Sequence, residues 1–294
     1  MPDTQYFTNI DGKYVKDAEA RQQLNDLEDY VESLDQPWTP LQDGYSNFWF
    51  ELTNDTLSPW LNFSAKNANA VIDWGDGSGE VALDTLTPTH TYSKAGKYIV
   101  KVKGVTGIAA QNAQASYIPK YTTVLTNVEL NNEVTTLGGN AFWRCFGLKN
   151  VGGTAVITAM SSGVTSYTAT LETFVKLNVT ATNTNFYQTF CLKKIVLGSA
   201  LTTLSNNSFA NCYSLEEIHI EATTPPTFGG VSVLTGLPSN YVIYVPVGYG
   251  DTYKATEGWS TYADHILEEG QTPNRAMLAK FNSAKTEEPQ DDMR

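Results

Sequence analysis

The pattern of apolar and polar positions changes twice along the chain. Before residue 37 the apolar residues recur at intervals of three and four, which is typical of an amphipathic helix. From about Phe48 to Gly104 they alternate with polar residues, as in half-buried strands, and from about residue 119 they recur every third position in repeated units. The pattern predicts a multidomain, mainly β protein with an N-terminal helix or coiled coil, a small β-sandwich and a solenoid of stacked repeats.

The N-terminal segment, residues 1–40, has an apolar stripe along one helix face. Its members, spaced by three, four and three residues, are Leu24, Leu27, Val31 and Leu34. Two heptads are too short to form a stable isolated helix in water, so the stripe needs a partner surface. It can pack on the chain's own globular part or on copies of itself. Pro37 and Pro40 favour the second, because they separate the helix from the rest of the chain. We expect a homo-oligomer, for example a trimer.

Residues 105–270 are predicted to form the solenoid. The first slot of each unit lies at 142, 165, 186 or 209, so successive units are 23, 21 and 23 residues long. A period of about 20–29 residues with apolar strand positions is typical of leucine-rich repeats, whose strands stack side by side. An earlier unit is expected around Leu125, Val128 and Leu130. The slots of the four units are Phe142, Cys145, Leu148 and Val151; Thr165, Thr168, Leu171 and Phe174; Phe186, Thr189, Leu192 and Ile195; and Phe209, Cys212, Leu215 and Ile218.

Two phrases, Val134–Val151 and Leu201–Ile220, resemble the BspA-like leucine-rich repeat. The end of the array is also similar, because a strand at Val242–Pro246 and a helix around Tyr253–Trp259 match the last strand and capping helix of such arrays. The resemblance covers about residues 120–267 and implies a bacterial protein whose chain normally begins with a signal peptide. The polar tail, residues 271–294, is expected to be disordered in isolation.

Repeat geometry predicts how the cysteines are used. Strands of a solenoid lie about 4.8 Å apart, so Cys145 and Cys212, three repeats apart, should be separated by roughly 14 Å. A disulfide requires Cα atoms within about 7 Å. We therefore expect both side chains to be buried as small hydrophobic groups. Together with Cys191, they are expected to form no disulfide framework.

The predicted sandwich, residues 46–104, is similar to another known module. Three phrases carry the similarity: Asp73–Gly77, His90–Tyr92 and Gly96–Val102. They resemble the polycystic-kidney-disease (PKD) module, which implies an immunoglobulin-like spacer of extracellular and surface proteins. Asp73 and Asp76 can bind calcium with Asp84, or can accept hydrogen bonds from turn amides. The second interpretation is favoured, because calcium takes six or more oxygen ligands. We expect no metal and no cofactor.

Composition narrows the class of function. The chain has 31 acidic and 19 basic residues and a net charge of −12, which argues against nucleic-acid binding and against attachment to anionic lipid. It contains no run of 18 apolar residues, so no membrane span is predicted. The three histidines, His90, His219 and His265, lie in separate segments, without a nucleophile, phosphate-loop or metal motif. The sequence therefore favours a protein that is not an enzyme.

Two surfaces of the repeats are candidates for binding. The residues that directly follow the first or second slot are often aromatic: Trp143, Phe146, Tyr187, Phe190 and Tyr213. Equivalent positions of stacked repeats form rows, so these rings can form a strip that binds carbohydrate or protein, or can pack between repeats and close the core. The second candidate is the concave face of the strands. The residues expected there are Glu129, Lys149, Lys176, Val196 and His219.

The first residues carry a further resemblance. Met1–Thr8 has neither the basic nor the apolar region of a secretory signal, so we expect a chain that stays inside the cell or leaves it by another route. Ile10–Arg21 is similar to the start of many tailed-phage fibre and virion proteins, whose first segment docks on the particle. This implies a bacteriophage virion structural protein, a head or tail fibre-like decoration made in the host cytoplasm. It would bind other virion proteins through its N-terminus and present the solenoid to a host surface protein or glycan.

Two alternatives stay open. The first is a bacterial cell-surface or secreted adhesin, which an apolar leader or a cell-wall anchor in the full gene would favour. The second, minor alternative is an accessory module of a glycan-degrading enzyme, which would need a cleft with paired carboxylates. In the virion and adhesin interpretations the solenoid offers contact area for attachment rather than reactive groups.

Overall fold

The structure is a computed structural model that describes residues 38–54, 57–111 and 124–273. Contacts divide the chain into two units, Met1–Thr39 and Pro40–Arg294, and every strand named below lies in the second. Some predictions fall outside the described residues and stay predictions. They concern the phage-like Ile10–Arg21, the tail from residue 274 onward, and the apolar stripe of Leu24, Leu27, Val31 and Leu34.

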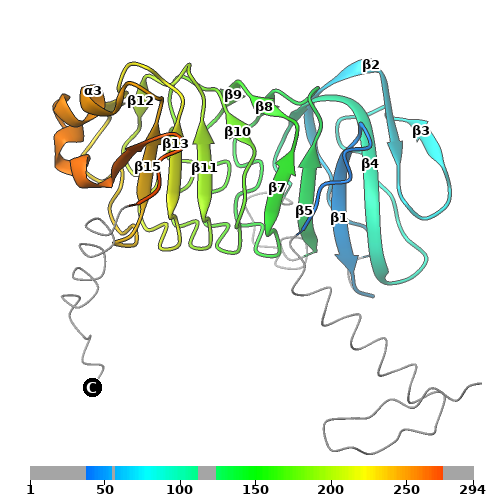
Figure 1. Ribbon diagram of the computed structural model, residues 1–294. Helices are drawn as coiled ribbons and strands as arrows, with labels where there is room; N and C mark the ends of the chain where they lie inside the picture. Colours follow the sequence, from blue (N-terminus) through cyan, green and yellow to red (C-terminus); the bar gives the residue numbers. More distant parts are fainter. Residues whose placement is uncertain (1–37, 55–56, 112–123, 274–294) are drawn as a thin grey trace, which may run out of the picture. The chain divides into compact units, whose positions relative to one another are not determined.

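An antiparallel sheet at the start of the second unit continues into the repeats. Its first strands are β1 (Ser46–Leu52), β2 (Phe63–Asp73), β3 (Glu80–Ala82) and β4 (Gly96–Ile108). They are arranged in the order β3-β2-β4-β1 (Figure 1). The next strand, β5 (Leu125–Leu130), pairs with the other edge of β1, and β7 (Asn150–Gly153) pairs with β5 in parallel.

The predicted β-sandwich differs from what the structure shows. A sandwich needs two facing sheets, whereas the four strands described between residues 46 and 108 lie in one sheet. The reason is edge pairing: β1 has β4 on one side and the first repeat strand on the other, and its buried Phe48 and Phe50 belong to the same core as the repeats. The boundary expected at residue 104 falls inside β4, whose end pairs with β6 (Thr136–Leu137). The first strands and the repeats therefore share one sheet and one core.

The repeats stack as parallel strands, as predicted. The remaining strands are β8 (Val156–Ile157), β9 (Ala159–Met160), β10 (Lys176–Leu177), β11 (Lys194–Leu197), β12 (Thr203–Leu204), β13 (Glu217–Ile220), β14 (Thr227–Phe228), β15 (Val242–Val245) and β16 (Ile266–Glu268). Six of them form a sheet in the order β16-β15-β13-β11-β10-β8, and β12 pairs with β14. Each strand of the six-stranded sheet pairs in parallel with the equivalent strand of the neighbouring repeat.

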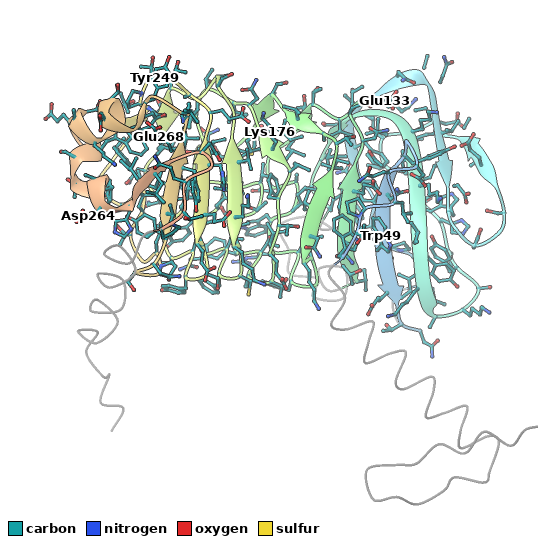
Figure 2. The ribbon with its side chains drawn as sticks, viewed as in Figure 1. Trp49, Glu133, Lys176, Tyr249, Asp264 and Glu268 are labelled. Atoms are coloured by element: carbon teal, nitrogen blue, oxygen red, sulfur yellow. The ribbon has the colours of Figure 1, made fainter. Side chains whose placement is uncertain are left out.

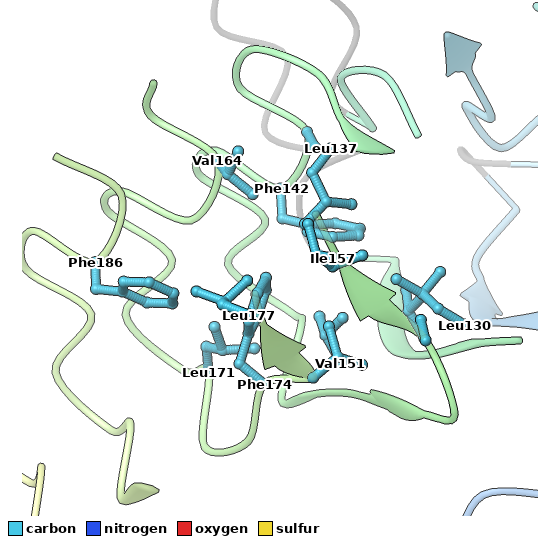
Figure 3. Packing of buried hydrophobic residues seen from close by; sticks show 14 of the residues in the cluster. Leu130, Leu137, Phe142, Val151, Ile157, Val164, Leu171, Phe174, Leu177 and Phe186 are labelled. Atoms are coloured by element: carbon cyan, nitrogen blue, oxygen red, sulfur yellow. The ribbon is translucent and has the colours of Figure 1, made fainter. Parts of the chain in front are cut away.

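The slot residues form the core. All four slots of all four predicted units are buried, and the most exposed of them, Phe174, is 9% exposed. Figure 3 shows Phe142, Phe174 and Phe186, from three successive units, pointing into a common interior. The prediction of a solenoid from the spacing of the slots is confirmed, including the two units in which threonine fills a slot.

Threonine and cysteine fill the second slot for a shared reason. The hydroxyl of Thr168 donates to the carbonyl oxygen of Phe142 in the preceding unit. The hydroxyl of Thr189 donates to the carbonyl oxygen of Thr165 at 3.2 Å, and the Cys212 thiol donates to that of Phe186 at 2.9 Å. A small side chain with a donor can be buried here because its hydrogen bond is satisfied.

The predicted burial of the cysteines is confirmed. Cys145 and Cys212 are free and 0% exposed. Burial raises the pKa of both thiols to about 12, because a thiolate is poorly solvated in the core. Cys191, by contrast, is free and exposed. The three thiols therefore differ strongly in accessibility.

A bulge at Gly153 separates the two larger sheets. Asn150 pairs with Thr173, and Ile157 pairs with Leu177, so seven steps along the chain through β7 and β8 match four steps in the next repeat. Gly153 has a φ of 105°, and a side chain there would run into the carbonyl of Leu130. The chain therefore places its three extra residues at this corner, and the parallel pairing resumes beyond it.

The end of the array is closed by α3 (Gly250–Ala255) and the 3-10 helix η1 (Trp259–His265). The predicted strand and capping helix are thus confirmed as β15 and α3, but β15 is not the last strand, because β16 follows the helices and pairs with it in parallel. Tyr253 and Trp259 are buried, and their polar atoms donate to the carbonyls of Ala222 and Pro226, both at 2.7 Å. These bonds let two large rings cover the last repeat without leaving a buried donor unpaired.

Candidate binding surfaces

The turns of the repeats form a regular surface, which we call the aromatic flank. It consists of residues 138–148, 161–171, 183–192 and 205–215. Each turn has two residues with a left-handed backbone, and the second of them is Arg144, Tyr167, Gln188 or Asn211, with φ between 55° and 62°. The amides of these residues donate to a carbonyl in the next turn, for example from Tyr167 to Tyr187 at 3.2 Å and from Gln188 to Ala210 at 3.0 Å. Hydrogen bonds between turns hold the side chains of the flank in fixed rows.

The first row contains two of the predicted aromatic residues and two that the sequence analysis missed. The guanidinium carbon of Arg144 lies 4.3 Å from the ring centre of Trp143 and 5.6 Å from that of Tyr167. Tyr167 in turn meets Tyr187 edge to face, with ring centres 5.7 Å apart. Tyr167 and Arg144 were missed because only the positions directly after a slot were considered. Their spacing of 23 residues, equal to one repeat, is the signal that could have found them.

The second row holds the other three predicted rings. Phe190 and Tyr213 stack with ring centres 5.4 Å apart and planes 20° apart. Phe146 belongs to the same row but is separated from Phe190 by one turn, in which Ala169 takes the position. Phe146, Phe190 and Tyr213 are 39%, 37% and 58% exposed, so the rings do not simply fill the core. The structure brings the predicted rings together in two rows rather than one strip.

The outward face of the strands is different, because its polar groups are paired with each other. His219 lies on this face between the buried Ile218 and Ile220. Its Nδ1 is 2.7 Å from Glu269 and its Nε2 is 3.0 Å from Glu217. Hydrogen bonds from His219 and Lys194 lower the pKa of the Glu217 carboxyl. Both ring nitrogens of His219 are thus engaged within the protein.

An apolar contact completes the surroundings of His219. Its ring stacks on Tyr244 at 4.6 Å, and Tyr244 packs with Val242 and Leu267 in a small cluster separate from the main core. The side chain of His219 is only 14% exposed. The arrangement favours a structural role for His219 over contact with a ligand.

The other residues expected on the strand face are also largely engaged. Lys176 pairs with Glu221 at 2.6 Å and lies on β10 (Figure 2). Glu129 is only 2% exposed, and its carboxylate accepts hydrogen bonds from the backbone amides of Leu41 and Gln42, at 2.9 and 2.7 Å, and from Asn47. Glu129 therefore fixes the segment before β1 and is not part of a free surface. The two remaining residues of this set are Lys149, which is exposed, and Val196, which is partly buried.

In the turn after β2, two carboxylates are hydrogen-bonded to turn amides, as the second of the two interpretations of this turn expected. Asp73 accepts from the amide of Gly75 at 2.8 Å, and Asp76 accepts from that of Ser78 at 3.0 Å. Hydrogen bonds from Ser78, and then from His90, lower the pKa of Asp76 to about 2. Within the described ranges, no group of three His, Cys, Asp or Glu side chains is arranged to hold a metal ion. The helical segments of these ranges are also too short and too polar to pass through a bilayer.

A comparison with protein families agrees with the repeat geometry. The model of the BspA type leucine rich repeat region matches residues 115–226 in six copies. A leucine rich cell surface protein from Faecalibacterium prausnitzii A2-165 has a similar structure, with a TM-score of 0.37 and 15% sequence identity. The match covers 81% of this chain and 56% of that one, so this chain spans little more than half the length of that protein. No curated protein sequence matches this chain.

The family model matches only part of the chain. The matched residues include neither the Asp73–Val102 region nor Ile10–Arg21, so the resemblances to a PKD module and to a phage fibre N-terminus stay predictions. They include every slot of the four predicted units. Residues 115–226 are therefore similar to the BspA type leucine rich repeat region, over the part of the chain that holds the predicted slots.

Proposed function

We propose that this protein is a non-enzymatic binding or adhesion protein and that the aromatic flank carries the contact. The observation behind this proposal is the pair of rows of half-exposed rings, held on turns that are hydrogen-bonded to one another. Flat, rigid rings give contact area at a small cost in side-chain entropy, which is why they are frequent in binding surfaces. The strand face supports the proposal by contrast, since its charged groups pair internally.

For the cellular setting, we propose a bacterial cell surface rather than a phage virion. The BspA type repeats are the part of the chain with a family match, and the resemblance they carry implies bacterial proteins. The virion interpretation depends on residues 10–21, which lie outside the described residues. The proposal also includes self-association through residues 1–40, because the apolar stripe there needs a partner.

Localisation tests the setting directly. Antibodies raised against the full chain should label intact cells of the organism that encodes it, and brief treatment of the cells with a protease should remove the label. Finding the chain in purified phage particles, with no label on cells, would restore the virion interpretation.

Attachment tests the function. The purified full chain, fluorescently labelled at its amines, should bind whole cells in flow cytometry. The variant Tyr213→Ala should bind less, while the matched control His219→Ala, on the strand face, should bind as the wild type does. Equal loss of binding in both variants would contradict the assignment to the aromatic flank.

A further inference from the structure

We infer that the aromatic flank binds a neutral polysaccharide, laid along the direction in which the repeats stack. This inference rests on the proposed binding function and names the chemical class of its ligand. It depends on three properties of the flank: its charge, the chemistry of its exposed groups and its repeat distance.

The flank is nearly free of charge although the protein is strongly acidic. The chain has a net charge of −12, yet the four turns of the flank, all described, contain one charged residue, Arg144. Its guanidinium lies over two aromatic rings of the same row. Of the carboxylates that directly follow these turns, Glu172 pairs with Lys193 at 3.1 Å. A cationic ligand would find no carboxylate on these turns, and an anionic polymer would find one cation among four turns.

The exposed groups of the flank suit a sugar. A pyranose ring has an apolar face of C–H groups and a rim of hydroxyls, so it needs aromatic surface next to neutral hydrogen-bonding groups. The half-exposed rings of the flank are separated by small polar side chains. Those that are exposed or partly exposed include Ser162, Thr170, Gln188, Asn207, Asn211 and Ser214. A protein partner would instead favour a continuous apolar centre with charged groups only at the rim.

The repeat distance fits a polymer. Equivalent residues of neighbouring turns are about 4.8 Å apart, which is similar to the length of one hexose unit in an extended glycan. A ligand that also repeats can place the same groups against successive turns. The row of Phe146, Ala169, Phe190 and Tyr213 has its small residue between two rings that lie two repeat steps, about 10 Å, apart. This gap can admit one sugar ring between Phe146 and Phe190, and Tyr213 supports Phe190 from the other side.

Affinity electrophoresis of the full chain tests the inference. Native gels should contain one soluble neutral polysaccharide each: galactomannan, xyloglucan, yeast mannan or glycogen. Parallel gels should contain the anionic polymers polygalacturonate or dextran sulfate. We expect at least one neutral polymer to retard the chain, and the anionic polymers to retard it less.

Variants connect the retardation to the flank. The double variant Phe190→Ala/Tyr213→Ala should weaken binding at least about tenfold. Ala169→Leu, which fills the gap without removing a ring, should also weaken it. His219→Ala should leave it unchanged. Thermal unfolding of each variant should show that the fold persists, because these side chains are at least partly exposed.

The outcomes separate this inference from the proposed function. Unchanged retardation of the flank variants, or retardation by anionic polymers alone, would overturn the inference. The same holds if none of the neutral polymers retards the chain. If cell binding still depends on Tyr213 in that case, the binding function stands and the ligand is of another class. Retardation that depends on the flank, without any label on intact cells, would support the ligand and contradict the proposed location.

Discussion

The two faces of the same repeats expose different kinds of side chain to solvent. On the strand face, oppositely charged side chains pair across the sheet, as Lys194 does with Glu217 on the adjacent strand and Lys176 with Glu221, which follows β13. On the aromatic flank, the turns carry almost no charge, and rings stay half-exposed between small polar residues. Both faces rest on the same buried slots. The comparison teaches that one side of this solenoid satisfies its own groups, while the other leaves them available to a partner.

The largest expected difference between surface and core is in the rates at which the three thiols react. Cys191 belongs to the flank and is exposed, whereas Cys145 and Cys212 are buried and have a pKa raised to about 12. With 5,5′-dithiobis(2-nitrobenzoic acid), one thiol should react rapidly in the native chain. The other two should react at least about a thousandfold more slowly, because they need the core to open. All three should react at once in denaturant, and fast reaction of two thiols in the native chain would contradict the shared core.

Removing an aromatic ring from the core should destabilise the repeats as a whole, and with them both faces. Phe186 is 0% exposed and contacts Phe174 and Phe209, at 5.3 and 5.4 Å between ring centres. Phe186→Ala should lower the free energy of unfolding by about 3–5 kcal/mol, because it leaves a cavity in the stack. Chemical denaturation followed by circular dichroism measures this loss. Phe190→Ala, four residues later but on the flank, should cost much less.

Removing one buried hydroxyl should have a smaller effect. Thr168→Val keeps the size of the side chain but loses the hydrogen bond to the carbonyl of Phe142. The free energy of unfolding should fall by about 1 kcal/mol. Thr180→Val, at an exposed position of the same repeat, is the matched control and should change it by less than about 0.5 kcal/mol. Equal effects would show that the hydroxyl in the slot is not needed.

The smallest expected effect is on the pH dependence of the free energy of unfolding, through a carboxylate of the strand face. The Glu217 carboxyl has a pKa below its ordinary value of 4.5, so its ionised form stabilises the fold above that pH. This contribution is lost as the pH falls through the lowered pKa. Because the side chain is 43% exposed, we expect less than about 1 kcal/mol. Urea denaturation between about pH 5 and pH 3 should show a weaker dependence on pH for Glu217→Gln than for the wild type. Polysaccharide retardation should not change with Glu217→Gln at neutral pH.

The sequence predicted the repeats well because their signal is periodic. Thr165 and Thr168 are poor hydrophobic residues, yet their distance of 23 from Phe142 and Cys145 placed them correctly in the core. Burial of a threonine is possible here because a neighbouring turn supplies an acceptor, a property that the period implies and that composition alone does not.

Features that depend on contacts between distant residues could not be predicted in the same way. The pairing of β1 with β5 joins residues that are about 80 positions apart, and no local pattern distinguishes it from closure of a separate sandwich. The sequence pattern placed Glu129 on the exposed face of a strand, because apolar and polar residues alternate around it. Its burial follows from the segment at Leu41 and Gln42, which folds over it. The pairing of His219 with Glu269 likewise spans 50 residues.

The bulge at Gly153 has a consequence for how such a chain can vary. Three additional residues are absorbed at a single corner, and the turns of the flank on either side remain hydrogen-bonded to each other. Insertions at that corner shift one sheet against the other without disturbing the rows of rings. During evolution, the number of residues at this corner can therefore change while the spacing between the rows of rings, which a long and regular partner would contact, stays the same.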